Sequence, residues 1–137
     1  MLKIILRVLP LLYMIVIFIL SSMPADAVVE LPRWDSLIKE SLHLVEFGIL
    51  YILLFLAALT IKEVSPRLNL ILILISSLYG LSDEVHQYFV PYRSATVIDL
   101  IKDVIGVLVA SWIVFGAYQR KRFHKLGNLL YHIGNLK

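Results

Sequence analysis

The chain has 137 residues, of which 60% are hydrophobic and 17% are charged, and its formal net charge is +3. Its mean hydropathy of +0.86 is too high for a soluble domain, in which apolar residues make up about half of the chain. The absence of cysteine excludes a disulfide framework, a thiolate nucleophile and thiolate metal ligands. The composition therefore predicts a membrane protein.

Four apolar runs follow one another along the chain, at residues 8–22, 42–61, 68–81 with its polar continuation, and 97–118. With its polar end included, each supplies the roughly 17 to 25 residues that cross a bilayer as a helix. We expect an all-α, polytopic membrane protein with four transmembrane helices in an up-and-down bundle. This transmembrane domain covers residues 1–118, and a basic tail follows at 119–137.

The first run also has the features of a secretory signal peptide. Lys3 and Arg7 precede its apolar core, and Ala25-Asp26-Ala27 resembles a cleavage site. We interpret the run as a retained helix, and cleavage after it stays an alternative.

The basic residues predict the orientation of the bundle. If the N-terminus is cytoplasmic, nine of the 13 basic residues lie inside, and only Arg33, Lys39, Arg93 and Lys102 lie outside. The positive-inside rule therefore favours cytoplasmic N- and C-termini. Of the ten acidic residues, only Glu63 falls inside. The outer end is acidic and the inner end is basic.

Alternating helix directions bring four polar patches to the outer end of the bundle. They are Ser21 and Ser22; Lys39, His43 and Glu46; Asp83, Glu84, His86 and Gln87; and Arg93, Ser94, Asp99 and Asp103. Helical periodicity places the polar residues of three helices on stripes that continue into small or apolar residues, which should face one another. The stripes are Lys39, His43, Glu46, Leu50, Leu53 and Ala57; Ser76, Gly80, Asp83 and Gln87; and Asp99, Asp103, Gly106 and Ala110.

Some of these residues have a purely structural explanation. Thr96 and Asp99 fit a helix-capping pattern, and Arg93 can reach lipid phosphates or pair with an acid. Glu46 and Asp103 lie beyond the first turn with apolar sequence after them, where a carboxylate costs about 2.5 to 3.5 kcal/mol near mid-bilayer. We expect both to pair, because His43 can reach Glu46, and Lys39 or Arg93 can neutralise acids of the other helices.

Two segments carry a resemblance to a known family. The stretch 41–47, SLHLVEF, resembles the S-x-H-x-x-E-[aromatic] signature of VanZ-like membrane proteins. A second block resembles the family's D-E-x-H-Q-x-F-x-P-x-R-S pattern and the D and G that follow it. Its members are Asp83, Glu84, His86, Gln87, Phe89, Pro91, Arg93, Ser94, Asp99, Asp103 and Gly106.

The resemblance implies a bacterial plasma-membrane protein, in a family named for resistance to the lipoglycopeptide teicoplanin. It implies no settled reaction. Two positions depart from the family's pattern: Lys39-Glu40 stands where paired basic residues are usual, and Tyr92 stands where glycine is common. The first departure lowers the positive charge of the pocket and puts an anion-binding role of that position in doubt.

Three functions follow as alternatives. In the first, the outer pocket binds or alters a lipid-linked envelope component, and whether it is an enzyme stays open. His43, Glu46, Glu84 and Asp103 are then the candidate catalytic residues, and the binding residues are Lys39, Asp83, His86, Gln87, Arg93, Ser94 and Asp99. In the second, the cluster is a structural network that docks a partner or the lipoglycopeptide without turnover. In the third, the acids and histidines relay protons for a small transporter.

Two further expectations concern ligands. Histidine and carboxylate ligands would suit a divalent metal, but no dense metal-binding motif occurs, so a metal cofactor stays open, as does oligomerisation. The tail from Arg120 to Lys137 mixes basic and apolar residues and predicts a short amphipathic helix on the inner leaflet. Nucleic-acid binding is a poor alternative for a basic segment tethered in this way.

Overall fold

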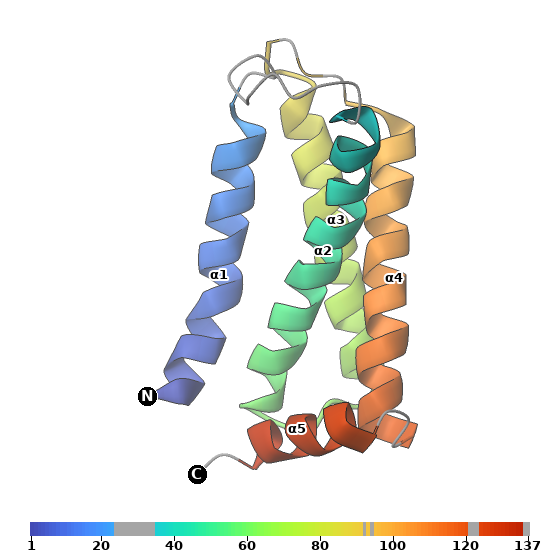
Figure 1. The fold of residues 1–137 in the computed structure, drawn as a ribbon. Helices are drawn as coiled ribbons and strands as arrows, with labels where there is room; N and C mark the ends of the chain where they lie inside the picture. Colours follow the sequence, from blue (N-terminus) through green and yellow to red (C-terminus); the bar gives the residue numbers. More distant parts are fainter. Residues whose placement is uncertain (24–34, 92, 94, 121–123, 136–137) are drawn as a thin grey trace.

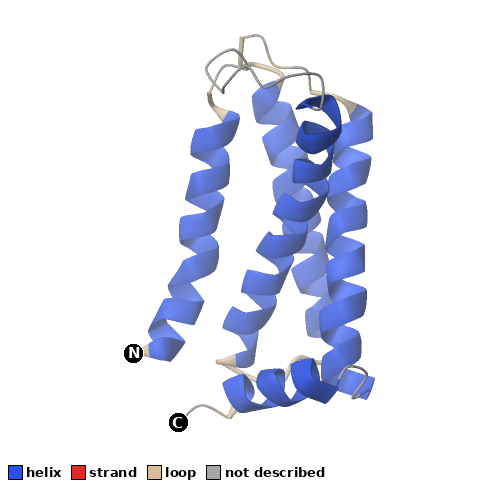
Figure 2. Cartoon of the chain, viewed as in Figure 1, coloured by secondary structure: helices blue, strands red, loops and turns tan. Residues whose placement is uncertain are grey.

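A computed structural model of the chain describes residues 1–23, 35–91, 93, 95–120 and 124–135, and at 35–43, 120 and 124 only the backbone. Within these residues the regular structure is entirely helical (Figure 2). The helices are α1 (Leu2–Ser21), α2 (Asp35–Leu59), α3 (Pro66–Gln87), α4 (Val97–Arg120) and α5 (His124–Gly134).

The first four helices run side by side in alternating directions, and α5 lies across one end of the bundle (Figure 1). We call the end where α1 begins and α5 lies the terminal end. The opposite end, where α1 and α3 finish and α4 begins, is the site end. The up-and-down order therefore brings the polar sequence after α3 to the same end as the last turn of α1.

Many large apolar side chains lie on the surface of the bundle, including Leu11, Phe18, Leu78 and Trp112, each more than half exposed. A surface of this kind suits hydrocarbon better than water. Among the described residues, α1 and α3 are long and apolar enough to cross a membrane, and 44–59 in α2 is a shorter apolar segment. The all-helical architecture is confirmed, whereas four membrane crossings stay a prediction.

The core lies where α2 meets its neighbours. Phe47, Leu50, Tyr51 and Phe55 of α2 are completely buried. Helical periodicity in the sequence placed Leu53 and Ala57 on the inward stripe of this helix, but both are only half-buried. The reason is that α2 contacts α1, α3 and α4 along its length. The buried face of α2 is therefore wider than one stripe, and it is centred on Phe47, Leu50, Tyr51 and Phe55.

Helices α2 and α4 approach each other closely at two glycines. A Cβ atom on Gly106 would overlap with the carbonyl oxygen of Leu44, and one on Gly48 would lie 3.2 Å from the carbonyl oxygen of Gly106. Small residues permit such backbone contact between membrane helices. The stripe from Asp103 through Gly106 to Ala110 is buried, as predicted.

Hydrogen bonds attach α1 to the rest of the bundle. Arg7 donates from Nε to Thr60 Oγ1 at 2.9 Å and from Nη2 to the Thr60 carbonyl oxygen at 2.7 Å. The hydroxyl of Tyr79 donates to the carbonyl oxygen of Met14 at 2.7 Å. The first helix is thus fastened to α3 and to the segment after α2. The cleavage-like sequence 25–27 lies outside the described residues.

The terminal helix α5 packs on the bundle. Leu130 is buried, and a Cβ atom on Gly127 would lie 3.0 Å from the carbonyl oxygen of Ala117 in α4. Leu129 and Tyr131 remain more than half exposed. The predicted short amphipathic helix is therefore present, with one face packed against α4 and α2.

Candidate functional site

The last turns of α3 carry buried polar side chains at the site end. Asp83 and Glu84 are each 6% exposed, and Gln87 is 3% exposed. The Gln87 Nε2 atom donates to Asp83 Oδ2 at 2.7 Å. Asp83 and Gln87 are one helical turn apart, so the stripe predicted from the sequence is present on α3 with Ser76 and Gly80 also buried.

Asp103 of α4 faces this stripe. Its side chain is completely buried. A Cβ atom on Gly80 would lie 3.3 Å from both Cβ and Oδ2 of Asp103, and 3.5 Å from Cδ1 of Phe47. Gly80 thus leaves the space that the carboxyl group of Asp103 fills between α3 and α2. Because water is excluded there, a carboxylate at this position requires partners from the protein or a ligand.

Arg93 joins the loop after α3 to the end of α1. Its Nη2 atom donates to the carbonyl oxygen of Leu20 at 2.7 Å, and its Nε atom donates to that of Met23 at 3.2 Å. A third bond of 3.4 Å runs from Nη1 to Gln87 Oε1. A guanidinium group is favourable at the carbonyl end of a helix. Gln87 therefore links Arg93 to Asp83.

The predicted pairing of Arg93 with an acid takes an indirect form. The partners that the described residues offer it are two main-chain oxygens and the amide of Gln87. The guanidinium group is connected to the carboxylate of Asp83 through the neutral side chain of Gln87. This arrangement leaves Arg93 half-buried at the rim of the bundle.

Glu84 and Asp99 hold the beginning of α4. Glu84 Oε2 accepts a hydrogen bond of 3.1 Å from the amide of Thr96. Thr96 Oγ1 accepts from the amide of Asp99 at 3.1 Å and donates to Asp99 Oδ2 at 2.6 Å. Lys102 pairs with Asp99 at 3.0 Å. Thr96 therefore caps α4, as its position predicted, whereas the Asp99 carboxylate binds the capping hydroxyl and Lys102, and the amide of Thr96 bonds to Glu84.

His86 faces α1. Its Nε2 atom lies 2.9 Å from Ser22 Oγ, and the centre of its ring lies 4.7 Å from that of Phe18. Ser21, which the sequence placed in the same patch, is buried. On α3, His86 and Asp83 therefore point to different neighbours: the imidazole to α1 and the carboxyl to the interior.

The remaining candidate residues are described incompletely. Lys39 and His43 belong to the first turns of α2, where the side chains lie outside the described residues, and Ser94 also lies outside them. Glu46 is half-buried, and its carbonyl oxygen accepts a hydrogen bond of 3.3 Å from the Tyr13 hydroxyl. The predicted contact between His43 and Glu46 stays a prediction.

The sequence left open whether a metal ion binds at this end. The described side chains, which do not include His43, form no group of three histidines or carboxylates placed to hold a metal ion. The described part of the site therefore offers carboxylates, an amide and a guanidinium group. This set can bind a phosphate at Arg93 and hold or transfer a proton at the buried acids.

A buried polar network that was not predicted from the sequence joins α2, α3 and α4. The Tyr51 hydroxyl donates to Asn69 Oδ1, and Asn69 Nδ2 donates to Ser111 Oγ at 3.2 Å. All three side chains are buried and lie on three different helices. A signal was available, because Asn69 lies seven residues before Ser76 and fourteen before Asp83, on the same helical face.

Comparison with known proteins gives the family. Residues 7–118 match the family described as VanZ/LLP1, and this segment contains α2, α3 and most of α1 and α4. The chain belongs to the VanZ/LLP1 family. The matched segment contains both VanZ-like sequence blocks, including Asp83, Glu84, Arg93 and Asp103, whereas α5 lies outside it. No curated protein and no solved structure matches the chain.

Proposed function

We propose that this VanZ-like protein binds a lipid-linked component of the bacterial cell envelope at the site end of the bundle. Binding there would contribute to resistance against glycopeptide antibiotics of the teicoplanin type. The proposal includes a plasma-membrane location with four crossings, both termini in the cytoplasm and the site end outside.

The observation that carries the proposal is the burial of three acids, Asp83, Glu84 and Asp103, at the end where Arg93 lies. Ionisable groups inside a membrane helix bundle are costly and are usually kept for function. Arg93 would bind a phosphate of the lipid carrier, because its planar guanidinium group offers two donors to phosphate oxygens. Lys39 would be the second cation.

The acids would have two further roles. Asp83 positions the Gln87 amide by the 2.7 Å hydrogen bond, and Gln87 in turn contacts Arg93. Glu46, Glu84 and Asp103, with His43, would accept or donate protons if the ligand is altered chemically. Ser94 and His86 would contact the ligand at the rim. Glu46→Gln separates binding from catalysis. If the variant keeps the fold and the ligand affinity of the unmodified protein but no longer forms a product, the site is catalytic.

A second candidate function is binding without turnover. The hydrogen bonds of Arg93 to α1 and of Glu84 to Thr96 favour it, because these bonds hold helix ends together. In that case the polar cluster determines how the helices pack against one another, and it presents a docking surface for a partner or an antibiotic. A proton-linked transporter ranks third, because four short helices leave little room for alternating access, and α5 covers the terminal end.

A binding titration tests the proposal. The probe is a long-chain polyprenyl phosphate, added to the full chain in lipid nanodiscs. We expect Arg93→Gln to weaken binding at least tenfold, because charge-assisted hydrogen bonds contribute about 1.5 to 3 kcal/mol. Arg67→Gln, an exposed change at the start of α3, is the matched control and should bind as the unmodified protein does.

A second control separates binding from folding. Gly127→Ala disturbs the packing of α5 on α4 at the terminal end, because its Cβ atom would lie 3.0 Å from the carbonyl oxygen of Ala117. Below its unfolding temperature this variant should retain most of its affinity. Equal affinity of Arg93→Gln and the unmodified protein, or equal losses in Arg93→Gln and Gly127→Ala, would reject the role of Arg93.

A further inference from the structure

Ser21 of α1 carries a buried hydroxyl group to which the proposed function gives no role. The side chain is 4% exposed, and its Oγ atom has no hydrogen-bond partner in the part of the chain that the structure describes. A serine inside a helix often donates to the carbonyl oxygen four residues earlier. Ser22 and Ser76 do so, at 2.6 Å from the oxygen of Phe18 and 3.0 Å from that of Leu72. A buried hydroxyl without a partner is costly, so Ser21 needs another explanation.

Ser21 lies on the inward face of α1. Pro10, Ile17 and Ser21 are the buried residues of this helix, and their spacing places them on one side of it. This side faces the interior of the bundle, because α1 packs on α2 and α3. The hydroxyl of Ser21 is therefore enclosed between the last turn of α1 and the neighbouring helices at the site end.

Both chain neighbours of Ser21 contact residues of the candidate site. The carbonyl oxygen of Leu20, in the peptide bond that leads to Ser21, accepts the 2.7 Å hydrogen bond from Arg93. On the other side, Ser22 Oγ lies 2.9 Å from His86 Nε2. The guanidinium group of Arg93 therefore meets α1 at the same turn that carries the unpaired hydroxyl.

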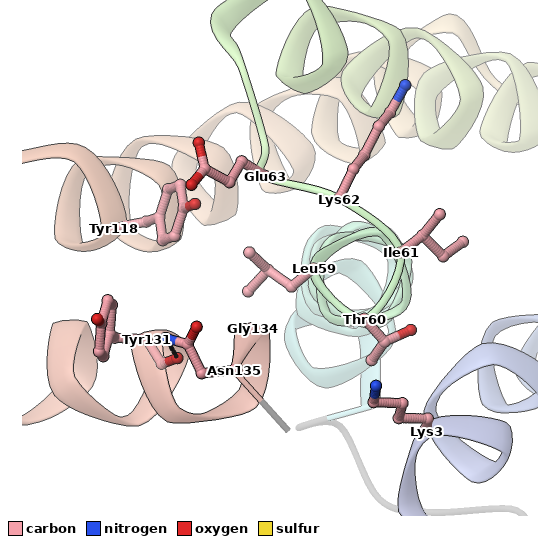
Figure 3. A pocket seen from close by; sticks show the side chains of 10 residues that line it. All are labelled: Lys3, Leu59, Thr60, Ile61, Lys62, Glu63, Tyr118, Tyr131, Gly134 and Asn135. Atoms are coloured by element: carbon pink, nitrogen blue, oxygen red, sulfur yellow. Dashed lines mark hydrogen bonds between the residues drawn. The ribbon is translucent and has the colours of Figure 1, made fainter. Parts of the chain in front are cut away.

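The opposite end of the bundle shows a buried hydroxyl that is fully used in holding helices together. A cavity of about 420 Å³ lies there, and the Lys3 amine lies next to Thr60 in its wall (Figure 3). The Thr60 hydroxyl donates to the carbonyl oxygen of Ala57 at 2.8 Å and accepts from Arg7 at 2.9 Å. Its one hydrogen is used, whereas the hydrogen of the Ser21 hydroxyl remains available to a ligand.

This hydrogen suits an anion held at Arg93, because hydrogen bonds to a charged phosphate are stronger than those between neutral groups. We propose that the Ser21 hydroxyl donates a hydrogen bond to the phosphate bound by Arg93, an inference that rests on the proposed function. Because Ser21 is buried, the phosphate reaches it only when the bonds from Arg93 to Leu20 and Met23 open. The phosphate then lies between the ends of α1 and α3, where it satisfies a donor that has no partner in the empty protein.

The titration with long-chain polyprenyl phosphate in lipid nanodiscs tests this inference on Ser21→Ala. We expect the variant to bind about tenfold more weakly, as for the loss of one hydrogen bond to a charged group. Its free energy of unfolding without ligand should stay the same or rise, because the substitution removes a buried hydroxyl that has no partner. A residue that only supports the fold would instead lower affinity and stability together.

The matched control is Ser77→Ala, because the Ser77 Oγ atom is also buried without a partner in the described part of the chain. Ser77 lies ten residues before Gln87 on α3, about 15 Å along the helix axis, so its substitution should leave the affinity unchanged. Lys3→Gln, at the cavity of the terminal end, should also bind as the unmodified protein does.

The double variant of Ser21→Ala and Arg93→Gln tests whether the two residues share one phosphate. Sharing predicts a combined loss smaller than the product of the single losses, because the phosphate is no longer held beside Ser21 once Arg93 is replaced. Unchanged affinity of Ser21→Ala, or a loss that Ser77→Ala reproduces, would overturn the role of Ser21 and leave that of Arg93 intact. Losses that multiply independently would also overturn it. If the unmodified protein does not bind polyprenyl phosphate, the proposed function itself is rejected, and this inference with it.

Discussion

Arg93 donates a hydrogen bond of 2.7 Å from Nη2 to the carbonyl oxygen of Leu20, in the last turn of α1. The residue proposed to bind phosphate therefore also holds the first helix against the bundle. Ligand binding at Arg93 would compete with the carbonyl oxygens of α1 for the same donors. The position of the end of α1 and the occupancy of the site are expected to depend on each other.

Removing the guanidinium group of Arg93 should loosen the end of α1. Arg93→Gln loses the two hydrogen bonds from the guanidinium group to the carbonyl oxygens of Leu20 and Met23. Each such bond contributes at most about 1.5 to 3 kcal/mol, and less for a half-exposed side chain. We expect a lower free energy of unfolding and faster amide hydrogen exchange in residues 18–23. Hydrogen exchange followed by mass spectrometry measures this. Unchanged exchange there would show that Arg93 does not hold α1.

Two glycines of α4 form a matched pair for testing the packing of α2 on α4. A Cβ atom at Gly106 overlaps with Leu44, whereas one at Gly116 meets nothing within 4 Å. Gly106→Ala should lower the free energy of unfolding by about 1 to 3 kcal/mol. Gly116→Ala should raise it by up to about 1 kcal/mol, because alanine favours helix. Unfolding in detergent compares them, and equal effects would contradict the close approach.

The buried network of Tyr51, Asn69 and Ser111 predicts a non-additive set of variants. Asn69→Leu leaves the Tyr51 and Ser111 hydroxyls without their partner and should cost about 1 to 2 kcal/mol. Adding Tyr51→Phe and Ser111→Ala removes the unpaired groups and should restore part of that loss. Denaturation of the single and triple variants measures the coupling. A triple variant less stable than the single one would contradict the network.

The start of α4 depends on one hydroxyl group. Thr96→Ala removes both hydrogen bonds to Asp99 and should lower the free energy of unfolding by about 1 kcal/mol. Thr96→Ser retains the hydroxyl and should stay near the unmodified protein. The same unfolding assay compares the two. If serine is as destabilising as alanine, the methyl group and not the cap is responsible.

Parts of this structure could be predicted from residue spacing alone. Ser76, Gly80, Asp83 and Gln87 share one face of α3 because their spacing follows the helical period, and all four are buried.

Helix ends were less predictable. The first apolar run begins at Val8, but α1 begins at Leu2, because Lys3 and Arg7 interrupt the hydropathy without interrupting the helix.

Contacts of the loops could not be predicted in the same way. The sequence suggested a lipid phosphate or an acid as the partner of Arg93, whereas its guanidinium group binds main-chain oxygens at the end of α1 and the amide of Gln87. Such partners depend on how the chain turns after α3, for which sequence periodicity carries no information. The Tyr51 contact with Asn69 was missed for a related reason: it depends on the rotation of α2 relative to α3.

The most direct measurement is photo-crosslinking with a polyprenyl phosphate that carries a photoreactive group next to its phosphate. The protein is labelled in nanodiscs, digested and mapped by mass spectrometry, with unlabelled polyprenyl phosphate as competitor. Binding at the proposed site predicts competed labels in residues 80–103, near the buried acids of α3 and α4. Labels confined to α5, or spread along the apolar surface of α1 and insensitive to competitor, would contradict a ligand site at that end.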